Sequence, residues 1–236
     1  MQIRVRQFPE RLSAKLGSGE THVWTARLDE PPRPVAELIA TLDPQERERG
    51  DRYKHPAIRD QFLRARGLLR VLLGGYLGIE PSAVGIALGP DGKPGLDDCG
   101  VEYNVSHSRG VAAFAVSDRP VGIDIEAVRA VPSADGLVRR YFGPGECERY
   151  FQLPDDLRPM AFLRAWTCKE ALLKAHGCGA RGLDQCEVEI DPRERPRVLQ
   201  MPGMERRWCV NCWEPAPGFL GAVAICGVES ASLEKV

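Results

Sequence analysis

The chain has 236 residues, of which 43% are hydrophobic, and a formal net charge of −1. A chain of this size buries a substantial core in one or two domains, and its near-neutral charge gives no global basic field to attract nucleic acid. No stretch approaches the roughly 18 apolar residues of a membrane span and the N-terminus has no apolar signal-peptide segment, so we expect a cytoplasmic protein without membrane or nucleic acid partners.

The first half of the chain is predicted to place helices before strands. The assignments rest on apolar periodicity and on the positions of glycine and proline. In chain order we expect helices over Glu37–Leu42, Pro44–Arg52 and Ile58–Leu77, a strand over Val84–Leu88, a turn at Asp91–Gly95, and strands over Glu102–Val105 and Val111–Val116. The Ser106–Gly110 segment is expected to be the polar loop between the last two strands.

The second half is predicted to repeat this order. In chain order we expect a strand over Val121–Glu126, helices over Leu137–Phe142, Pro144–Gln152 and Leu157–His176, and strands over Val188–Ile190, Arg207–Trp213 and Leu220–Ile225. The tetrapeptide Phe62-Leu-Arg-Ala65 recurs as Phe162-Leu-Arg-Ala165 in the second long helix. We therefore predict an α+β fold of two similar α/β halves, residues 1–118 and 119–236, with a ligand site in the cleft between them.

Three carboxylates in two motifs are the main candidates for chemistry. Side chains alternate along a strand, so Asp124 and Glu126 share one face of the predicted strand. On the predicted helix, Lys169 and Glu170 fall inside the apolar stripe that faces the core. A buried charge must be paired or coordinated, and oxygen ligands favour Mg²⁺ or a similar hard cation shared with substrate phosphates. The alternative is structural: a solvated strand edge and a Glu170–Lys174 pair on a helix surface.

Two further segments carry groups that suit phosphate. Asn104-Val-Ser106-His107-Ser108 ends a predicted strand with hydroxyl groups and an imidazole, which bind phosphate oxygens; a polar hairpin loop is the structural alternative. A run of basic residues is rich enough to hold a polyphosphate, although such a run is more often a solvated face. The run comprises Arg47, Arg49, Arg52, Lys54, Arg59, Arg64, Arg66 and Arg70.

The eight cysteines include one CxxC motif, Cys209-Val-Asn-Cys212. No second pair with zinc-ligand spacing accompanies it, and in a strand its two cysteines point to opposite faces. Free, partly buried thiols of a reducing compartment are therefore the favoured interpretation.

The motifs, taken in their order, resemble those of the 4′-phosphopantetheinyl transferases of the long, surfactin-synthetase-activating type. The resemblance covers residues 45–225 and rests on Gly92-Lys93-Pro94, Asn104–Ser108, Gly122–Glu126, Tyr141–Glu146 and Trp166–Lys174. It implies a pseudo-twofold arrangement of the two halves, with coenzyme A and Mg²⁺, or Mn²⁺ as the alternative cation, in the cleft between them.

By position, the resemblance implies a role for most of these residues. The implied assignments are Asp124, Glu126 and Glu170 as metal ligands, Asp124, Lys174 and Ser106 near the coenzyme A diphosphate, His107 as a 3′-phosphate contact, and Lys93 and Pro94 as the turn that meets the adenine. The family usually has an arginine where this chain has Gln61, so Arg52, Lys54 or Arg64 is expected to compensate. Glu146 matches a family glutamate whose role the residues do not reveal.

The resemblance implies a reaction as well as a site. A serine of an apo acyl-carrier or peptidyl-carrier protein would accept 4′-phosphopantetheine from coenzyme A, with release of 3′,5′-ADP, while Mg²⁺ neutralises the pyrophosphate. Glu170 is the expected general base, directly or through a metal-bound water. Lys174 would stabilise the leaving phosphate, and Lys169 would hold the carboxylates or the phosphate.

Two expectations concern partners. Because the fused halves already form the cleft, a monomer is expected. The Val128–Phe142 stretch, with exposed-looking Val131, Leu137, Tyr141 and Phe142, is a candidate docking surface for a helix of the carrier protein. A plain surface loop followed by a core-packed helix is the alternative.

Two other functions fit part of the pattern. Asp124, Glu126, Lys169 and Glu170 loosely resemble a metal-dependent nuclease site, against which the missing basic groove argues. A non-catalytic module that binds coenzyme A or a carrier protein is the other alternative, and the departure at Gln61 favours it.

Overall fold

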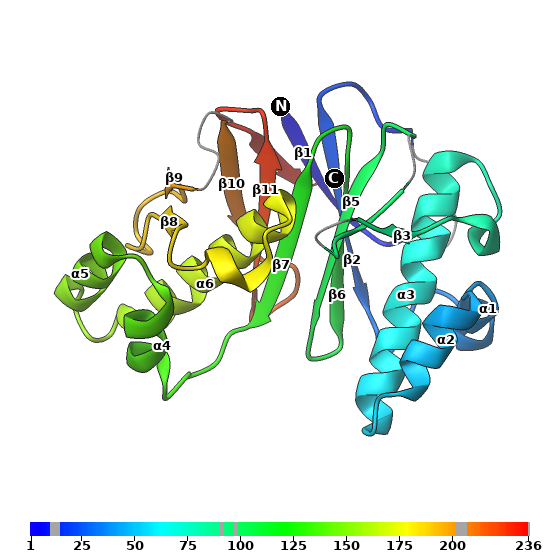
Figure 1. Ribbon diagram of the computed structural model, residues 1–236, viewed down its shortest axis with the longest axis horizontal. Coiled ribbons are helices and arrows are strands. Elements are labelled where there is room, and N and C mark those ends of the chain that lie inside the picture. The colour runs from blue at the N-terminus through cyan, green and yellow to red at the C-terminus, as the bar shows by residue number, and fades with distance from the viewer. Residues whose placement is uncertain (10–14, 90–91, 97–98, 202–206, 236) are drawn as a thin grey trace.

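Two larger β-sheets, two small two-stranded sheets and two groups of helices make up the α+β fold of the described residues (Figure 1). The computed structural model describes residues 1–9, 15–89, 92–96, 99–201 and 207–235. The helices are α1 (Val35–Ala40), α2 (Pro44–Asp51), α3 (Pro56–Leu77), α4 (Ala134–Tyr141), α5 (Pro144–Gln152) and α6 (Arg158–His176). The strands are β1 (Gln2–Gln7), β2 (Glu20–Arg27), β3 (Ala87–Leu88), β4 (Pro94–Gly95), β5 (Glu102–Ser108), β6 (Val111–Ser117), β7 (Val121–Ala127), β8 (Glu187–Val188), β9 (Val198–Gln200), β10 (Trp208–Trp213), β11 (Phe219–Cys226) and β12 (Ser232–Lys235).

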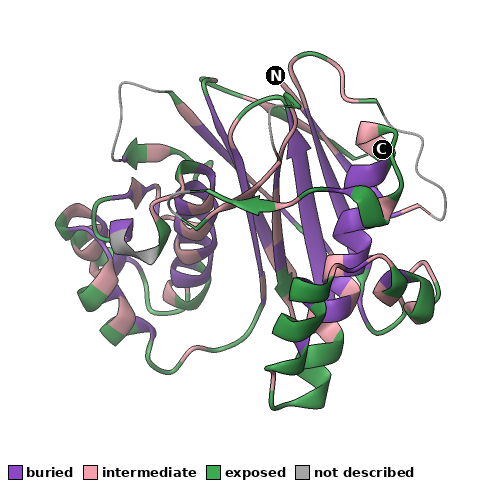
Figure 2. Cartoon of the chain, turned by 45° about the vertical axis from the view of Figure 1, so that its right-hand side comes forward, coloured by how far each residue is buried: buried purple, intermediate pink, exposed green. Residues whose placement is uncertain are grey.

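The two larger sheets each have one face covered by a long helix and share a core on the other. A five-stranded sheet has the order β12-β1-β2-β6-β5, and a three-stranded sheet has the order β10-β11-β7. Helix α3 packs on the first sheet and α6 on the second (Figure 1). Between the sheets lies a third apolar cluster that includes Ile3, Val23, Ile123 and Val223, and Figure 2 shows the strands there as buried. None of the helices in the described part of the chain combines the length and apolar character needed to cross a bilayer.

Three strands near the ends of the chain, β1, β2 and β12, were not predicted. Strand β1 alternates buried Ile3 and Val5 with more exposed residues, and it pairs in parallel with β2 and with β12. The pairing of β12 with β1 brings Ser232 opposite Gln2, so the last described strand belongs to the sheet formed by the first half. The boundary between residues 118 and 119 therefore stays a prediction. Strand β12 lies after this boundary in the sequence but pairs with a strand that lies before it.

One predicted loop and one predicted strand differ from the structure. Ser106, His107 and Ser108 lie in β5 and not in a loop; the β5–β6 connection is the two-residue turn Arg109-Gly110, with φ values of 43° and 81°. Positive φ at both positions is typical of the hairpin turns that match strand twist, so the strand runs on to Ser108. The predicted strand at Val84–Leu88 is reduced to β3, and Asp91 of the predicted turn lies outside the described residues.

Gly122 allows α6 to approach β7 closely. A Cβ atom at Gly122 would lie 2.0 Å from the carbonyl oxygen of Ala171 and 2.4 Å from the nitrogen of Ala175. We expect Gly122→Ala to destabilise the protein by about 3 kcal/mol, because the backbone of α6 must move. Gly136→Ala is the matched control: a Cβ there meets open space in α4, so the free energy of unfolding should rise by about 0.5–1 kcal/mol. Urea denaturation measures both, and an unchanged midpoint for Gly122→Ala would contradict the close approach.

Candidate functional site

The edges of the two larger sheets meet along β5 and β7, where side chains replace the usual backbone ladder. The Ile123 N–H donates to Asn104 Oδ1 at 2.9 Å, and the Ile125 N–H donates to Ser106 Oγ at 3.3 Å. The Ala127 N–H donates to Ser108 Oγ at 3.4 Å. Asn104, Ser106 and Ser108 lie on one face of β5 because side chains alternate. The polar motif predicted as a phosphate-binding loop therefore also joins the two sheets.

The predicted alternation of β7 is confirmed. Ile123 and Ile125 belong to the apolar cluster between the sheets, whereas Asp124 contacts side chains of β5 and α6. Asp124 Oδ1 accepts from Lys174 Nζ at 2.7 Å and from Ser106 Oγ at 2.9 Å. Asp124 is 6% exposed, and its second oxygen, Oδ2, is buried without a hydrogen-bond partner among the described residues. A buried carboxylate oxygen without a partner is costly, so this atom suits a bound cation.

Glu126 and Glu170 feel the charge of Asp124. Burial and the Asp124 charge raise the pKa of Glu126, while the Ser108 hydroxyl, 3.2 Å from Glu126 Oε2, opposes the rise. Burial raises the pKa of Glu170 despite the Lys174 ammonium, and the Asp124 and Glu126 charges add to the rise. The three carboxylates therefore repel one another in the absence of a cation.

The three carboxylates do not form a closed coordination shell. Across the described ranges, no group of three or more His, Cys, Asp or Glu side chains is arranged to hold a metal ion. These three carboxylates are neighbours whose charges interact. They are not arranged around one ion, as the prediction of three shared metal ligands would require. The donor set still fits a hard divalent cation, because all three groups offer oxygen and Asp124 Oδ2 has no other partner.

A cleft adjoins these carboxylates between β5, the β3–β4 hairpin, α3 and α6. Two cavities of about 320 and 290 Å³ share Pro94, Val105 and Lys174 as lining residues. The predicted residues that line one or both are Lys93, Pro94, Ser106, His107 and Lys174. A cavity of about 400 Å³ near Val131 and Phe162 is lined by none of these residues, so size alone does not mark the site.

The predicted cations Arg52 and Lys54 lie outside the cleft. Both are exposed, and Arg52 pairs with Glu48 at 2.7 Å, so neither fits the expected compensation for Gln61. Arg64 donates to the carbonyl of Leu28 at 2.7 Å and does not line the cleft either.

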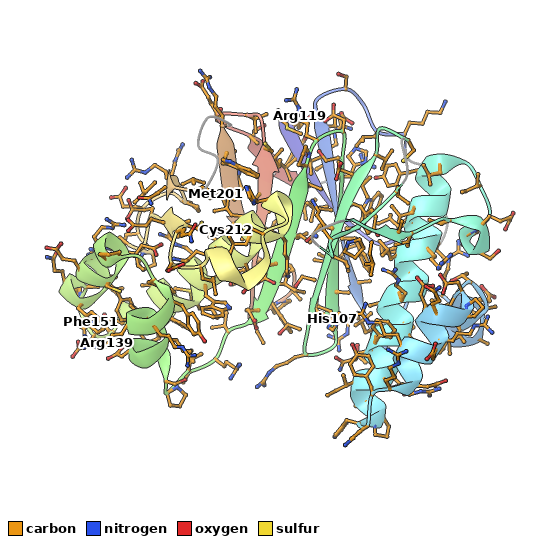
Figure 3. The ribbon with its side chains drawn as sticks, in the orientation of Figure 1. His107, Arg119, Arg139, Phe151, Met201 and Cys212 are labelled. Atoms are coloured by element: carbon orange, nitrogen blue, oxygen red, sulfur yellow. The ribbon has the colours of Figure 1, made fainter. Side chains whose placement is uncertain are left out.

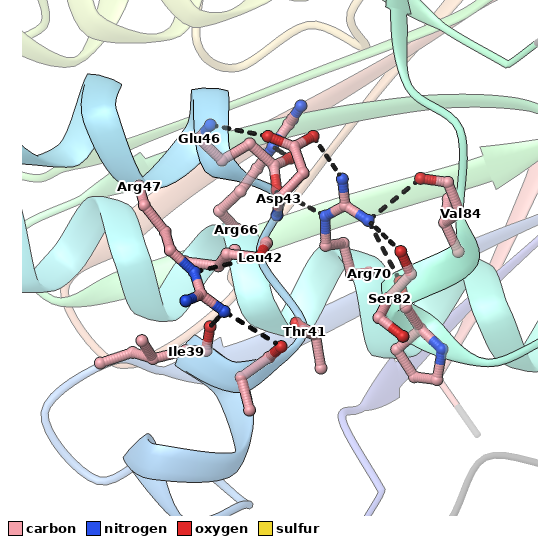
Figure 4. A network of polar contacts seen from close by, with 12 residues as sticks. Ile39, Thr41, Leu42, Asp43, Glu46, Arg47, Arg66, Arg70, Ser82 and Val84 are labelled. Atoms are coloured by element: carbon pink, nitrogen blue, oxygen red, sulfur yellow. Dashed lines mark hydrogen bonds and ion pairs between the residues drawn. The ribbon is translucent and has the colours of Figure 1, made fainter.

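Two other arginines of the predicted basic run line the cleft instead, although neither was expected to compensate for Gln61. Arg49 and Arg66 belong to the lining, together with Tyr53 and Phe62. Arg66 forms an ion pair with buried Glu46. Glu46 also pairs with Arg70, which reaches Asp43 at 2.7 Å and nearby carbonyls (Figure 4). This network fixes the side of α3 that faces the cleft. Its one local sequence pattern, the Asp43–Glu46 spacing of the capping box at the start of α2, was not used in the prediction.

Lys169 requires a correction, because it does not lie with the three carboxylates. Its ammonium is fully buried, forms an ion pair with Glu146 and lies 4.4 Å from the ring centroid of Phe142. Glu146 also accepts from the backbone N–H groups of Val188, at 2.7 Å, and Gly143, at 3.1 Å. The pair links α6 to α5 and β8, so its contacts are structural and the catalytic role predicted for Lys169 does not fit them.

His107 and Lys93 are both weakened as cations by their surroundings. His107 lines the cleft on the α3 side of β5 (Figure 3), where desolvation and the Lys174 charge lower its pKa. Burial lowers the pKa of Lys93, whose Nζ donates to the Ala175 carbonyl at 3.1 Å. Lys93 therefore bridges the β3–β4 hairpin to the end of α6.

The predicted docking surface is less exposed than its sequence suggested. Val128 is 46% exposed, but Phe142 is only 5% exposed and stacks on Phe162 with ring centroids 6.0 Å apart. Val131, Leu137 and Tyr141 are partly buried against the core around α6. The stretch therefore combines an exposed loop with a core-packed helix.

Comparisons with known proteins converge on one family. The family model described as the 4′-phosphopantetheinyl transferase superfamily matches residues 120–225. The 4′-phosphopantetheinyl transferase HetI of Nostoc sp. is 38% identical over 225 residues, which are 93% of this chain and 93% of HetI. The 4′-phosphopantetheinyl transferase Sfp of Bacillus subtilis is 24% identical over 188 residues, 79% of this chain and 83% of Sfp.

Proposed function

The chain belongs to the 4′-phosphopantetheinyl transferase family, and from this premise we propose that it transfers 4′-phosphopantetheine from coenzyme A to a serine of an apo carrier protein, with release of 3′,5′-ADP. The observation that carries the proposal is the contact of buried Asp124 with Ser106 and Lys174, two residues that line the cleft. Phosphoryl transfer depends mainly on positioning and charge stabilisation, which a carboxylate cluster, a lysine and a polar strand edge can provide.

Asp124, Glu126 and Glu170 are proposed to hold Mg²⁺. When bound, Mg²⁺ would neutralise charge on the coenzyme A pyrophosphate. Lys174 is proposed to stabilise the leaving phosphate, since its ammonium lies at the cleft and 2.7 Å from Asp124. Glu170 is proposed as the general base: its raised pKa brings it closer to neutral pH, where a base accepts a proton most effectively.

Coenzyme A is proposed to bind along the cleft, with its phosphates near Ser106, His107 and Lys174 and its adenine near Pro94. These four residues line the two adjoining cavities. Arg49 and Arg66 are proposed to replace the arginine that the family usually has at position 61. Both residues line the same cavity as His107.

Arg66→Ala is expected to raise the KM for coenzyme A about tenfold or more, because a hydrogen bond to a charged group contributes about 1.5–3 kcal/mol. Steady-state transfer with coenzyme A and with dephospho-coenzyme A, which lacks the 3′-phosphate, measures the effect. If Arg66 binds the 3′-phosphate, the penalty is confined to coenzyme A. Arg52→Ala is the control and should change neither KM. Equal KM values for the two arginine variants would contradict the role of Arg66.

Affinity for Mg²⁺ is expected to rise as pH rises through the raised pKa values of Glu126 and Glu170, because protons compete for carboxylate ligands. The same two groups bind protons more tightly in the folded than in the unfolded chain, so without the cation they lower the free energy of unfolding as pH rises through their pKa values. Calorimetric titration with Mg²⁺ across this range measures the effect. An affinity that stays flat with pH would contradict the assigned ligands.

The activity is tested by incubating the protein with coenzyme A, Mg²⁺ and several apo carrier proteins, and weighing the carriers by mass spectrometry. A mass gain of one phosphopantetheine on the carrier serine is expected, together with stoichiometric 3′,5′-ADP. If no carrier gains mass while coenzyme A still binds, the non-catalytic binding module is the better description.

We also infer that the two halves are related by a pseudo-twofold axis. Each long helix contains the Phe-Leu-Arg-Ala tetrapeptide and ends at a left-handed glycine, Gly78 with φ of 69° after α3 and Gly177 with φ of 94° after α6. Each helix also covers one face of an antiparallel set of strands, β5–β6 and β7–β11. These parallels support a duplication in which the cleft forms along the joint.

A further inference from the structure

Two cysteines that are distant in the sequence bring their sulfur atoms together. Cys168 on α6 and Cys212 on β10 lie with Sγ atoms 3.4 Å apart, and both thiols are free. Strand alternation separates Cys212 from Cys209: Cys212 packs with the core under α6, and Cys209 does not. The partner of Cys212 is therefore Cys168 and not its neighbour in the CxxC motif.

The two sulfur atoms are in direct contact but are not bonded. A disulfide has its sulfurs about 2.05 Å apart, so closing the pair requires a relative movement of about 1.3 Å. Cys168 is 1% exposed, whereas Cys212 is half-buried at the end of β10 against α6 (Figure 3). Cys212 is the more exposed residue of the pair, so we expect an oxidant from solvent to reach its sulfur before that of Cys168.

We propose that Cys168 and Cys212 form a dithiol modification site, which a hydroperoxide oxidises to an intramolecular disulfide. The Cys212 sulfur attacks one peroxide oxygen, the O–O bond breaks, and one alcohol or water molecule leaves. The resulting sulfenic acid is attacked by the Cys168 sulfur, which forms the S–S bond and releases water. In total the two thiols lose two protons and two electrons, and the peroxide is reduced.

The disulfide also changes the helix that carries the proposed site. Cys168 precedes Lys169 of the buried ion pair and lies two residues before Glu170 on the same helix. A disulfide pulls α6 toward β10 and so shifts Glu170 and Lys174 relative to Asp124 on β7. Lys174 and Asp124 are in contact at 2.7 Å, so a small shift of the helix lengthens or breaks this hydrogen bond. Resting on the proposed transfer activity, this step predicts that oxidation lowers transfer several-fold and that dithiothreitol restores it.

Peptide mapping tests the site without reference to activity. The folded protein is treated with hydrogen peroxide, its free thiols are alkylated, and it is digested with trypsin without reduction. The expected product is the peptide Ala165–Lys169 linked to Trp208–Lys235. Its mass is that of the two peptides with Cys209 and Cys226 alkylated and Cys168 and Cys212 unmodified, less two hydrogen atoms. The link should persist in Cys209→Ser, disappear in Cys212→Ser, and form at lower peroxide exposure than oxidation of the lone, exposed Cys99.

Each outcome decides one part of the proposal. Recovery of alkylated Cys168 after Cys99 has been oxidised would overturn the site, as would an equal yield of the link in Cys212→Ser. A mapped disulfide with unchanged transfer would overturn the effect on α6. Absence of transfer from the reduced protein as well would count against the proposed function and leave the mapped disulfide intact.

Discussion

Glu170→Gln is expected to lower the rate of phosphopantetheine transfer by about 100-fold or more, the contribution of a positioned general base. The amide keeps the shape of the side chain but can neither accept the proton of the carrier serine nor provide a full negative charge. Burial and two neighbouring carboxylates raise the pKa of Glu170, so its charged form is disfavoured in the fold. The variant should therefore unfold at the same or a higher temperature than the parent protein.

Glu126→Gln is the matched comparison, because Glu126 shares the carboxylate cluster but is proposed only as a metal ligand. Raising the Mg²⁺ concentration should restore transfer in Glu126→Gln, where affinity for the cation is weakened, and should leave the rate of Glu170→Gln low. Glu148→Gln, at an exposed position of α5, should behave like the parent. Full rescue of Glu170→Gln by Mg²⁺ would reassign Glu170 as a ligand alone, and undiminished transfer would remove it from the site.

Local periodicity predicted the elements around the site well, because each depends on neighbours in the sequence. Strand β7 was predicted at Val121–Glu126 and spans Val121–Ala127, and α6 was predicted at Leu157–His176 and spans Arg158–His176. Strand β12 was missed because its stabilising partner, β1, lies at the other end of the chain. Short polar strands of this kind gain their stability from tertiary pairing, which no local window contains.

The errors in the site have a common physical cause, which is burial on more than one face. Helix α6 buries residues around most of its circumference, including Leu163, Lys169 and Leu173. An apolar stripe therefore could not tell which buried charge faces β7 and which faces α5. The same limit applies to the basic run on α2 and α3, where Arg70 is buried in an ion-pair network and Arg66 reaches the cleft. The orientation of these charged side chains depends on their ion-pair partners in the fold, which the spacing of residues in the sequence does not reveal.

Lys169→Met is expected to lower the free energy of unfolding by about 3–5 kcal/mol, because it leaves the Glu146 carboxylate buried without its cation. Both side chains of the pair are 0% exposed, so solvent cannot replace the lost partner. Burial already raises the pKa of Glu146, and loss of the Lys169 charge raises it further. Glu146 then takes up a proton in the folded state, so the destabilisation should be smaller at about pH 5 than at about pH 8. Urea denaturation at both pH values measures it.

The double variant Lys169→Met/Glu146→Gln separates the ion pair from a catalytic role. Glutamine keeps an oxygen for the backbone N–H groups of Gly143 and Val188 but removes the buried charge, so the double variant should recover much of the lost stability and show little dependence on pH. Transfer by Lys169→Met, measured well below its unfolding temperature, should remain within a few-fold of the parent, because Lys169 contacts Glu146 and Phe142 and not Asp124. A large loss of transfer with unchanged stability would return Lys169 to the catalytic group that the sequence predicted.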